Sequence, residues 1–249
     1  MSWRHLRLAL LVLAVLAVIV LVGAARILRG HPNVLWMIVN EKCVPDMQAH
    51  GTPAPCSEVS LAAGYTVLKD LRGAYQFLLI PTHRVTGIED PYVRAANAPD
   101  YFAEAWAAKH WLEGRLGHAV PRQDVALAVN SWFGRSQNQL HIHIDCLRPD
   151  VATALAGSNT GDGWGSMTLP PYGHVYEVRK LDSADLTGVN PFQLAAQSQR
   201  AGSDMGHDTV IVAGAADGFY LLVGRANLLR LNLGAGSELE DPSCAIAKP

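Results

Sequence analysis

The sequence lacks an excess of charge of either sign, and it lacks any cysteine pair at the spacing of a zinc or redox motif. Lysine and arginine number 20 against 22 aspartate and glutamate residues, for a formal net charge of -2. Without a basic excess, little attracts a nucleic-acid backbone, so no nucleic acid is expected as a partner. The absence of a CxxC spacing argues against thiolate zinc sites and dithiol redox chemistry. A hydrophobic content of 49% nevertheless indicates a globular protein with a sizeable core.

Long hydrophobic runs are also missing, with one exception near the amino terminus. Residues 8–25 carry no charge, and arginines flank them on both sides. At a helical rise of about 1.5 Å this run reaches roughly 27 Å, close to the hydrocarbon thickness of a bilayer and longer than a signal-peptide core. We therefore expect residues 1–30 to form an uncleaved transmembrane anchor, and residues 31–249 to form a body on one face of the membrane. The small residues 23–25 keep cleavage as an alternative.

The four cysteines are even in number and permit two disulfides. Cys43 and Cys56 would close a short loop rich in proline and glycine, which makes them the preferred pair and leaves Cys146 for Cys244. Four free, buried thiols remain an equally good alternative on composition alone.

The body is predicted to be α+β, with an antiparallel sheet. Short apolar or alternating runs punctuated by glycine and proline indicate strands, and apolar residues at helical spacing indicate helices. Strands are expected at 57–62, 65–70, 75–81, 125–130, 139–146 and 173–181, and as a hairpin within 208–225. Helices are expected around 34–40, from 99–100 to about 114 or 117, and around 191–201, and residues 43–56 are expected to be irregular.

The second half of the body repeats the order strand, helix, hairpin in a looser form. This repetition suggests a decayed internal duplication, with residues 31–150 as the active half and residues 151–249 as a degenerate half. The second hairpin carries no histidine, so the chemistry is expected in the first.

The stretch QLHIHID, residues 139–145, alternates polar and apolar side chains. On a strand, Gln139, His141, His143 and Asp145 would share one face. This pattern has three interpretations. The face is solvated and the histidines are incidental; the histidines hold a metal, although only Asp145 or a distant histidine offers a third ligand; or a neutral imidazole attacks phosphorus.

A resemblance to a known superfamily supports the third interpretation. Residues 134–143, GRSQNQLHIH, resemble the signature Gly-x-Ser-x-x-His-φ-His-φ-His of the histidine triad (HIT) superfamily, where φ is apolar and Gln139 stands at the first histidine. The strand within 74–90 and the run that ends at Asn130 also resemble that superfamily's core. Over roughly residues 57–149, the resemblance implies a HIT-like antiparallel sheet with packed helices.

The missing first histidine leaves two alignments open. In the first, which also matches Ser136, His141 is the nucleophile, and His143, Gln139 and Ser136 assist it. In the second, His143 is the nucleophile and Asp145 takes the third position. The first is preferred because it matches two additional positions of the signature, including the glycine.

With its amino-terminal apolar run, the chain resembles more closely the bacterial CDP-diacylglycerol pyrophosphatase family. The resemblance implies cleavage of CDP-diacylglycerol to CMP and phosphatidate through a nucleotidyl-histidine, without an obligatory metal or cofactor. It implies Asn130, His83 and Asp145 as substrate-binding residues, and a single-pass protein of the inner membrane with a periplasmic body. The alternatives are a HIT-type hydrolase or nucleotidyl transferase with a soluble substrate, and a non-catalytic protein that binds nucleotide-lipids.

Overall fold

A computed structural model describes residues 31–158, 163–198 and 204–248, together with seven isolated positions among the first sixteen residues. The apolar run predicted as an anchor, residues 8–25, lies almost wholly outside the described residues. Within the described ranges, no helix combines the length and the apolar character needed to cross a bilayer.

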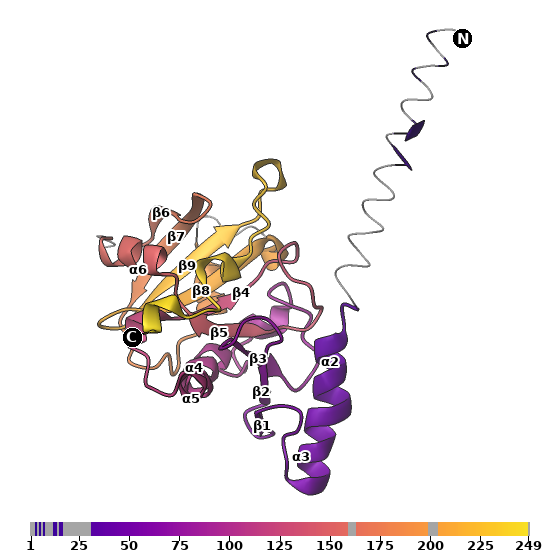
Figure 1. The fold of residues 1–249 in the computed structure, drawn as a ribbon, viewed down its shortest axis with the longest axis vertical. Helices are drawn as coiled ribbons and strands as arrows, with labels where there is room; N and C mark the ends of the chain where they lie inside the picture. The colour runs from indigo at the N-terminus through magenta and orange to yellow at the C-terminus, as the bar shows by residue number, and fades with distance from the viewer. Residues whose placement is uncertain are drawn as a thin grey trace.

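The described body is α+β and is built on one antiparallel sheet (Figure 1). Its nine described strands follow the spatial order β1-β2-β3-β5-β4-β8-β9-β7-β6. The strands are β1 Glu58–Ser60, β2 Tyr65–Lys69, β3 Phe77–Pro81, β4 Val125–Val129, β5 Ile142–Cys146, β6 Gly165–Leu169, β7 His174–Leu181, β8 Asp208–Gly214 and β9 Phe219–Arg225. The longer helical segments are α2 Val34–Ile38, η1 Val39–Cys43, α3 Val44–His50, α4 Tyr101–Ala107, α5 His110–Leu116, α6 Pro149–Ala156 and α7 Pro191–Ala195.

The two halves of the sheet have the same internal order. Strands β2-β3-β5-β4 of the first half correspond in sequence order to β6-β7-β9-β8 of the second, and β4 pairs with β8 where the halves meet. In both halves, helices precede the last two strands: α4 and α5 in the first half, and α7 in the second.

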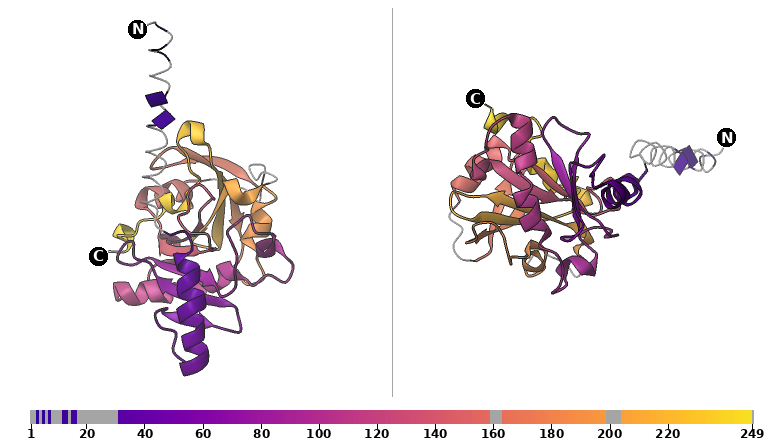
Figure 2. Two further views of the ribbon diagram at one scale, coloured as in Figure 1. Left: turned by 90° about the vertical axis from the view of Figure 1, so that its right-hand side faces the viewer. Right: turned by 90° about the horizontal axis from the view of Figure 1, so that it is seen from below.

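The two faces of the sheet are covered differently. Helices α4, α5 and α7 pack on one face over the main apolar core, to which the apolar residues of β5, such as Ile142 and Ile144, belong. On the other face α2 packs through Leu35 on β3, while α6 and the short helix Gly236–Leu239 cover the strands where the halves meet. In Figures 1 and 2 the α2–α3 segment lies along the β1–β3 end of the sheet. His141 and His143 lie on this second face, in the space between α2 and the short helix Gly236–Leu239.

The structure corrects several predicted boundaries. The 43–56 segment, expected to be irregular, contains helix α3, which has Pro45 in its first turn and ends at Gly51 with a left-handed φ of 69°. The expected helix up to 114 or 117 is two helices, α4 and α5, separated by Ala108 and Lys109. Helix α6 and strand β6 were not foreseen.

The predicted strand 139–146 begins only at Ile142. Ahead of that residue the backbone turns away from the ladder, because the Leu140 N–H donates to the Val85 carbonyl at 2.7 Å. Gln139 and His141 therefore lie on the segment that enters the strand.

Both predicted disulfides are present, Cys43–Cys56 and Cys146–Cys244. The first joins the end of η1 to the segment before β1. The second joins β5 to the carboxy-terminal segment, in which Glu240 lies 3.8 Å from His143.

Candidate active site

A pocket of about 380 Å³ lies on the histidine-bearing face. One part of its wall is polar and comes from β5, the end of β4, the loop between them and the short helix Gly236–Leu239. The other part comes from α2, β2, β3 and the loop after β2, where apolar side chains stand beside the charged Lys69, Asp70 and Arg72. The polar part includes Asn130, Arg135, Ser136, His141, His143 and Ser237, and the apolar side chains of the other part include Val34, Leu35, Ile38, Leu68, Leu71 and Leu78.

The His141 ring has one nitrogen fixed by the backbone. Its Nδ1 lies 2.7 Å from the Gln139 carbonyl oxygen, which only accepts, so Nδ1 carries the proton and Nε2 carries the lone pair. Nε2 makes no hydrogen bond within the described part of the chain, and the ring lines the pocket. Burial lowers the pKa of His141, so the ring stays neutral at neutral pH. A neutral imidazole with a free lone pair at a pocket is suited to nucleophilic attack.

His143 is held by Asn130, at the end of β4. The Asn130 Oδ1 accepts a hydrogen bond from the Ser237 backbone N–H at 3.1 Å, which turns Nδ2 toward the His143 Nε2 at 3.4 Å. Nε2 of His143 is thus the acceptor, and Nδ1 carries the proton. Burial, followed by the charges of His141 and Arg72, holds the pKa of His143 well below its usual value. The two imidazole rings lie with their centroids 5.1 Å apart.

Two buried carboxyl groups lie behind the histidines. Oε2 of Glu240 is 3.8 Å from Nδ1 of His143, and the Glu240 carboxylate oxygens have no hydrogen-bond partner in the described chain. Burial raises the pKa of Glu240 well above its usual value, and the charges of Asp145 and Asp70 add to the effect. Burial likewise raises the pKa of Asp145 to about 7. Close, buried carboxyls disfavour one another's ionisation, so this pair holds protons at a pH where exposed acids have lost them.

Asp145 itself does not line the pocket. Its Oδ2 accepts a hydrogen bond from Gln76 at 2.9 Å, its Oδ1 accepts one from the Cys146 N–H at 2.8 Å, and the side chain is fully buried. Asp145 therefore does not face the pocket, where the sequence led us to expect a substrate-binding residue.

Gln139 is also turned away from the pocket. Its amide nitrogen donates to the carbonyl oxygens of Pro81 and His83 at 3.2 and 2.9 Å, and its oxygen accepts from the Val85 N–H at 3.4 Å. The side chain is fully buried. Gln139 therefore fastens the strand entry to the segment after β3, and through its own carbonyl it fixes the tautomer of His141.

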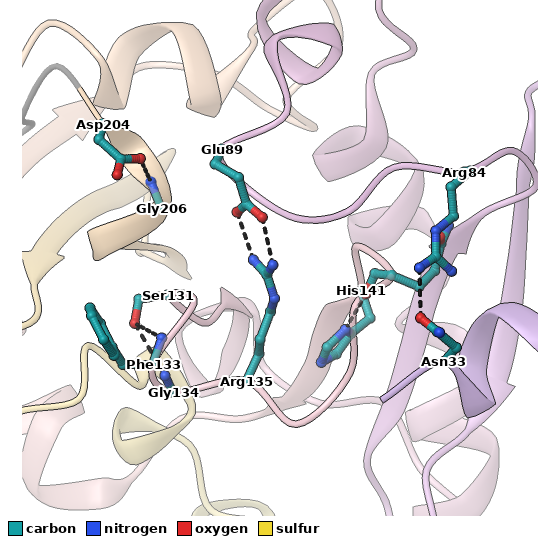
Figure 3. Close-up of polar contacts among 11 residues, drawn as sticks. Asn33, Arg84, Glu89, Ser131, Phe133, Gly134, Arg135, His141, Asp204 and Gly206 are labelled. Carbon is teal, nitrogen blue, oxygen red and sulfur yellow. Dashed lines mark hydrogen bonds and ion pairs between the residues drawn. The ribbon is translucent and has the colours of Figure 1, made fainter. Parts of the chain in front are cut away.

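The loop between β4 and β5 supplies two further polar groups. Ser136 is exposed and lines the pocket, as its predicted contact with a phosphate requires. Arg135 lines the pocket too, but it is buried and forms a two-pronged ion pair with Glu89 at 2.6 and 2.5 Å (Figure 3). This pair fastens the loop that carries Ser136 and His141 to the segment after β3.

His83, predicted as a binding residue, does not line the pocket. Its ring meets Tyr92 edge to face at 4.6 Å between centroids, and burial lowers its pKa. The structure thus brings together His141, His143, Ser136 and Asn130. It leaves Gln139, Asp145 and His83 out of the pocket wall.

The described residues offer little support for the alternative interpretation, a metal site. Their one cluster of three candidate ligands is Asp145, Cys146 and Cys244, and its two sulfurs are joined in a disulfide. Cystine sulfur supplies no thiolate to a metal.

Sequence reasoning missed Glu240, Ser237 and Arg72. None of the three lies in a recognisable motif: Ser237 is in the short helix Gly236–Leu239, Arg72 follows β2, and Glu240 follows that helix. The Cys146–Cys244 pairing was the one available signal that the carboxy-terminal segment returns to β5.

These features define a class of protein: an α+β protein whose antiparallel sheet carries two neutral imidazoles into a pocket lined by polar and charged groups and by an apolar cluster from α2, β2 and β3. The comparisons with known proteins are more specific. The family model for CDP-diacylglycerol pyrophosphatase matches residues 30–248. The chain is 37% identical to a CDP-diacylglycerol pyrophosphatase of Yersinia pestis over an alignment of 250 residues. The alignment covers 98% of this chain and 95% of the Yersinia protein. The chain therefore belongs to the CDP-diacylglycerol pyrophosphatase family, and the family predicted from the sequence is confirmed.

Proposed function

We propose that this enzyme hydrolyses CDP-diacylglycerol to CMP and phosphatidate in the pocket that contains His141. Family membership supports this substrate. The observation that carries the assignment to the pocket is its mixed lining, in which polar and charged side chains lie beside an apolar cluster from α2, β2 and β3. A nucleotide diphosphate requires the polar groups, and the glycerolipid attached to it requires the apolar ones.

In the proposed mechanism, the lone pair on Nε2 of His141 attacks the phosphorus that carries the cytidine. A nitrogen–phosphorus bond forms, the bond from that phosphorus to the bridging oxygen breaks, and phosphatidate leaves with the bonding electrons. Water then attacks the same phosphorus, releases CMP and restores the neutral ring. The Nδ1–H bond to the Gln139 carbonyl supports this sequence, since it stabilises the positive charge that the substituted ring acquires.

The other polar groups have supporting roles in this proposal. The exposed Ser136 hydroxyl donates to a phosphoryl oxygen. Asn130 and His143 form the floor beneath the diphosphate, where Asn130 sets the His143 tautomer. The first sequence alignment is preferred, because Gln139 contributes through its carbonyl and Asp145 is shielded from the pocket.

We further propose that each half of the sheet is HIT-like and that the halves arose by duplication. The identical strand order in the two halves supports this. The degenerate half then serves as a support, because it supplies Ser237 and Glu240 to the site of the active half.

Membrane tethering through residues 1–30 also belongs to this proposal, with the body on the periplasmic side of the inner membrane. A tether raises the effective concentration of a lipid substrate at the pocket. The two disulfides support an oxidising compartment for the body.

Product analysis in oxygen-18 water tests the proposed reaction. With CDP-diacylglycerol as substrate, we expect the label in CMP and none in phosphatidate. Label in phosphatidate would place the attack on the other phosphorus. A soluble CDP-alcohol or a diadenosine polyphosphate, offered separately, gives the comparison; if the soluble compound is strongly preferred, the lipid assignment is wrong.

A further inference from the structure

The loop that follows β9 exposes four leucines within six residues. Leu228, Leu229, Leu231 and Leu233 are 51, 99, 87 and 43% exposed. In Figure 1 this loop, drawn in yellow after β9, projects beyond the end of the sheet. A concentration of large apolar side chains on a projecting loop usually marks an interaction surface.

The loop is held in a defined shape. Asn227 and Asn232 exchange two backbone hydrogen bonds of 2.8 and 3.0 Å across its base, and the Asn232 side chain accepts from the Gly234 N–H at 2.7 Å. Leu231 adopts a left-handed φ of 56°, a conformation that favours glycine or asparagine. The leucines are thus presented on a fixed turn.

The base of the loop is part of the active site. Leu233 lines the same pocket as His141, and its carbonyl oxygen accepts a hydrogen bond from the Ser131 hydroxyl at 2.5 Å. The Ser131 N–H donates to the Gly234 carbonyl at 2.9 Å. Since Ser131 begins the loop between β4 and β5, the leucine loop and the polar wall of the pocket are joined directly.

We propose that Leu228–Leu233 inserts into a lipid bilayer and holds the mouth of the pocket at the headgroup plane. A projecting turn of six residues offers little area to a protein partner, but its exposed leucines can enter the acyl boundary of a bilayer. The exposed Arg230, between Leu229 and Leu231, is suited to reach lipid phosphates while its stem stays among the chains. The expected benefit to catalysis rests on the proposed lipid substrate. The insertion of the loop into a bilayer does not depend on the identity of the substrate.

Insertion is tested on the full chain with a fluorophore. The native cysteines are all in disulfides, so Leu229→Cys provides one free thiol for an environment-sensitive dye. The control is Ala216→Cys, exposed in the β8–β9 turn at the opposite end of that hairpin. Both proteins are reconstituted in vesicles of phosphatidylcholine and phosphatidylglycerol, some with brominated acyl chains.

We expect a blue shift and bromolipid quenching of the dye at position 229 and neither at position 216. An aqueous spectrum at 229, or equal quenching at both positions, would overturn the proposal. So would a blue shift in lipid-free protein that grows with protein concentration, because it would identify a second copy of the chain as the partner.

A second variant links insertion to turnover. The double substitution Leu229→Asn, Leu231→Asn keeps a residue suited to the left-handed φ, so it is expected to fold. It should lower kcat/KM for CDP-diacylglycerol in vesicles at least about tenfold, since burying one leucine is worth about that factor. Turnover of a water-soluble CDP-alcohol should not change, and equal losses on both substrates would contradict the proposal. If the wild-type chain hydrolyses no nucleotide-lipid while the dye still inserts, the proposed function fails and the membrane surface stands.

Discussion

Replacing Asp145 by asparagine should remove a large pH dependence of stability. The side chain is fully buried, and it accepts hydrogen bonds from Gln76 and from the Cys146 N–H. Asparagine has nearly the same shape and keeps an acceptor for the Cys146 N–H. Its NH₂ group faces Gln76, whose amide can turn to present its oxygen. The substitution therefore removes the ionisable group while it preserves the packing.

The expected magnitude follows from the pKa of Asp145, raised from 3.8 to about 7 chiefly by burial. An acid with a raised folded pKa gives its full stability below the unfolded pKa and loses it as pH rises through the folded pKa. Each unit of separation corresponds to about 1.4 kcal/mol, so the loss between pH 4 and pH 7 is on the order of 4 kcal/mol. That is a large part of the roughly 5–15 kcal/mol by which a typical domain is stable.

The assay is urea unfolding followed by tryptophan fluorescence, with the disulfides intact, at a series of pH values from 4 to 7. The free energy of unfolding of Asp145→Asn minus that of the wild type should rise with pH by about 4 kcal/mol. Asp217→Asn is the control. Asp217 is exposed, and hydrogen bonding to Lys180 lowers its pKa, so its difference should stay flat or fall. A constant difference for Asp145→Asn over the whole range would refute the burial argument.

The remaining predictions concern the site and its supports. His141→Ala should abolish turnover of CDP-diacylglycerol and His143→Ala should only reduce it; the opposite ranking, with both variants folded by circular dichroism, would favour the second alignment. Because burial lowers the pKa of His141 below 6.5 and attack requires the neutral ring, the acidic limb of kcat/KM against pH should have its midpoint below 6.5, and a midpoint above it would contradict this. Gln139→Ala should lower the free energy of unfolding by about 1–3 kcal/mol in urea unfolding, because it leaves buried carbonyls without a donor; an unchanged value would refute its fastening role. The double variant Cys146→Ser, Cys244→Ser, at positions 98 apart in the sequence, should lose about 4–5 kcal/mol in the same assay, and a loss below about 1 kcal/mol would show that the bridge contributes little.

Sequence patterns predicted those parts of the fold that depend on residues close together in the sequence. The alternation around His143 indicated a strand with one polar face, and the structure places that strand, β5, between β3 and β4. The short spacing of Cys43 and Cys56 indicated one bridge, and elimination gave the other. The repeat of strand, helix and hairpin suggested two halves that arose by duplication, which stays a prediction.

The parts that sequence reasoning missed depend on long-range contacts. Glu240 reaches His143 from a segment about a hundred residues away, and nothing in its neighbourhood marks it as part of a site. The role of Gln139 was also unpredictable, since its amide contacts are with backbone groups of a segment more than fifty residues earlier. Strand periodicity placed Gln139 and Asp145 on the same face as His141. It could not show that the Gln139 side chain binds backbone carbonyls after β3, or that Asp145 is buried beside the Cys146–Cys244 disulfide.

The proposal that His141 forms a covalent bond to the substrate is tested most directly by trapping. The wild-type enzyme, mixed with CDP-diacylglycerol and quenched rapidly without acid, is digested, and its peptides are mapped by mass spectrometry. We predict a cytidylyl adduct on His141 that is absent in His141→Ala. An adduct on His143 alone, or no adduct together with full turnover by His141→Ala, would contradict the account.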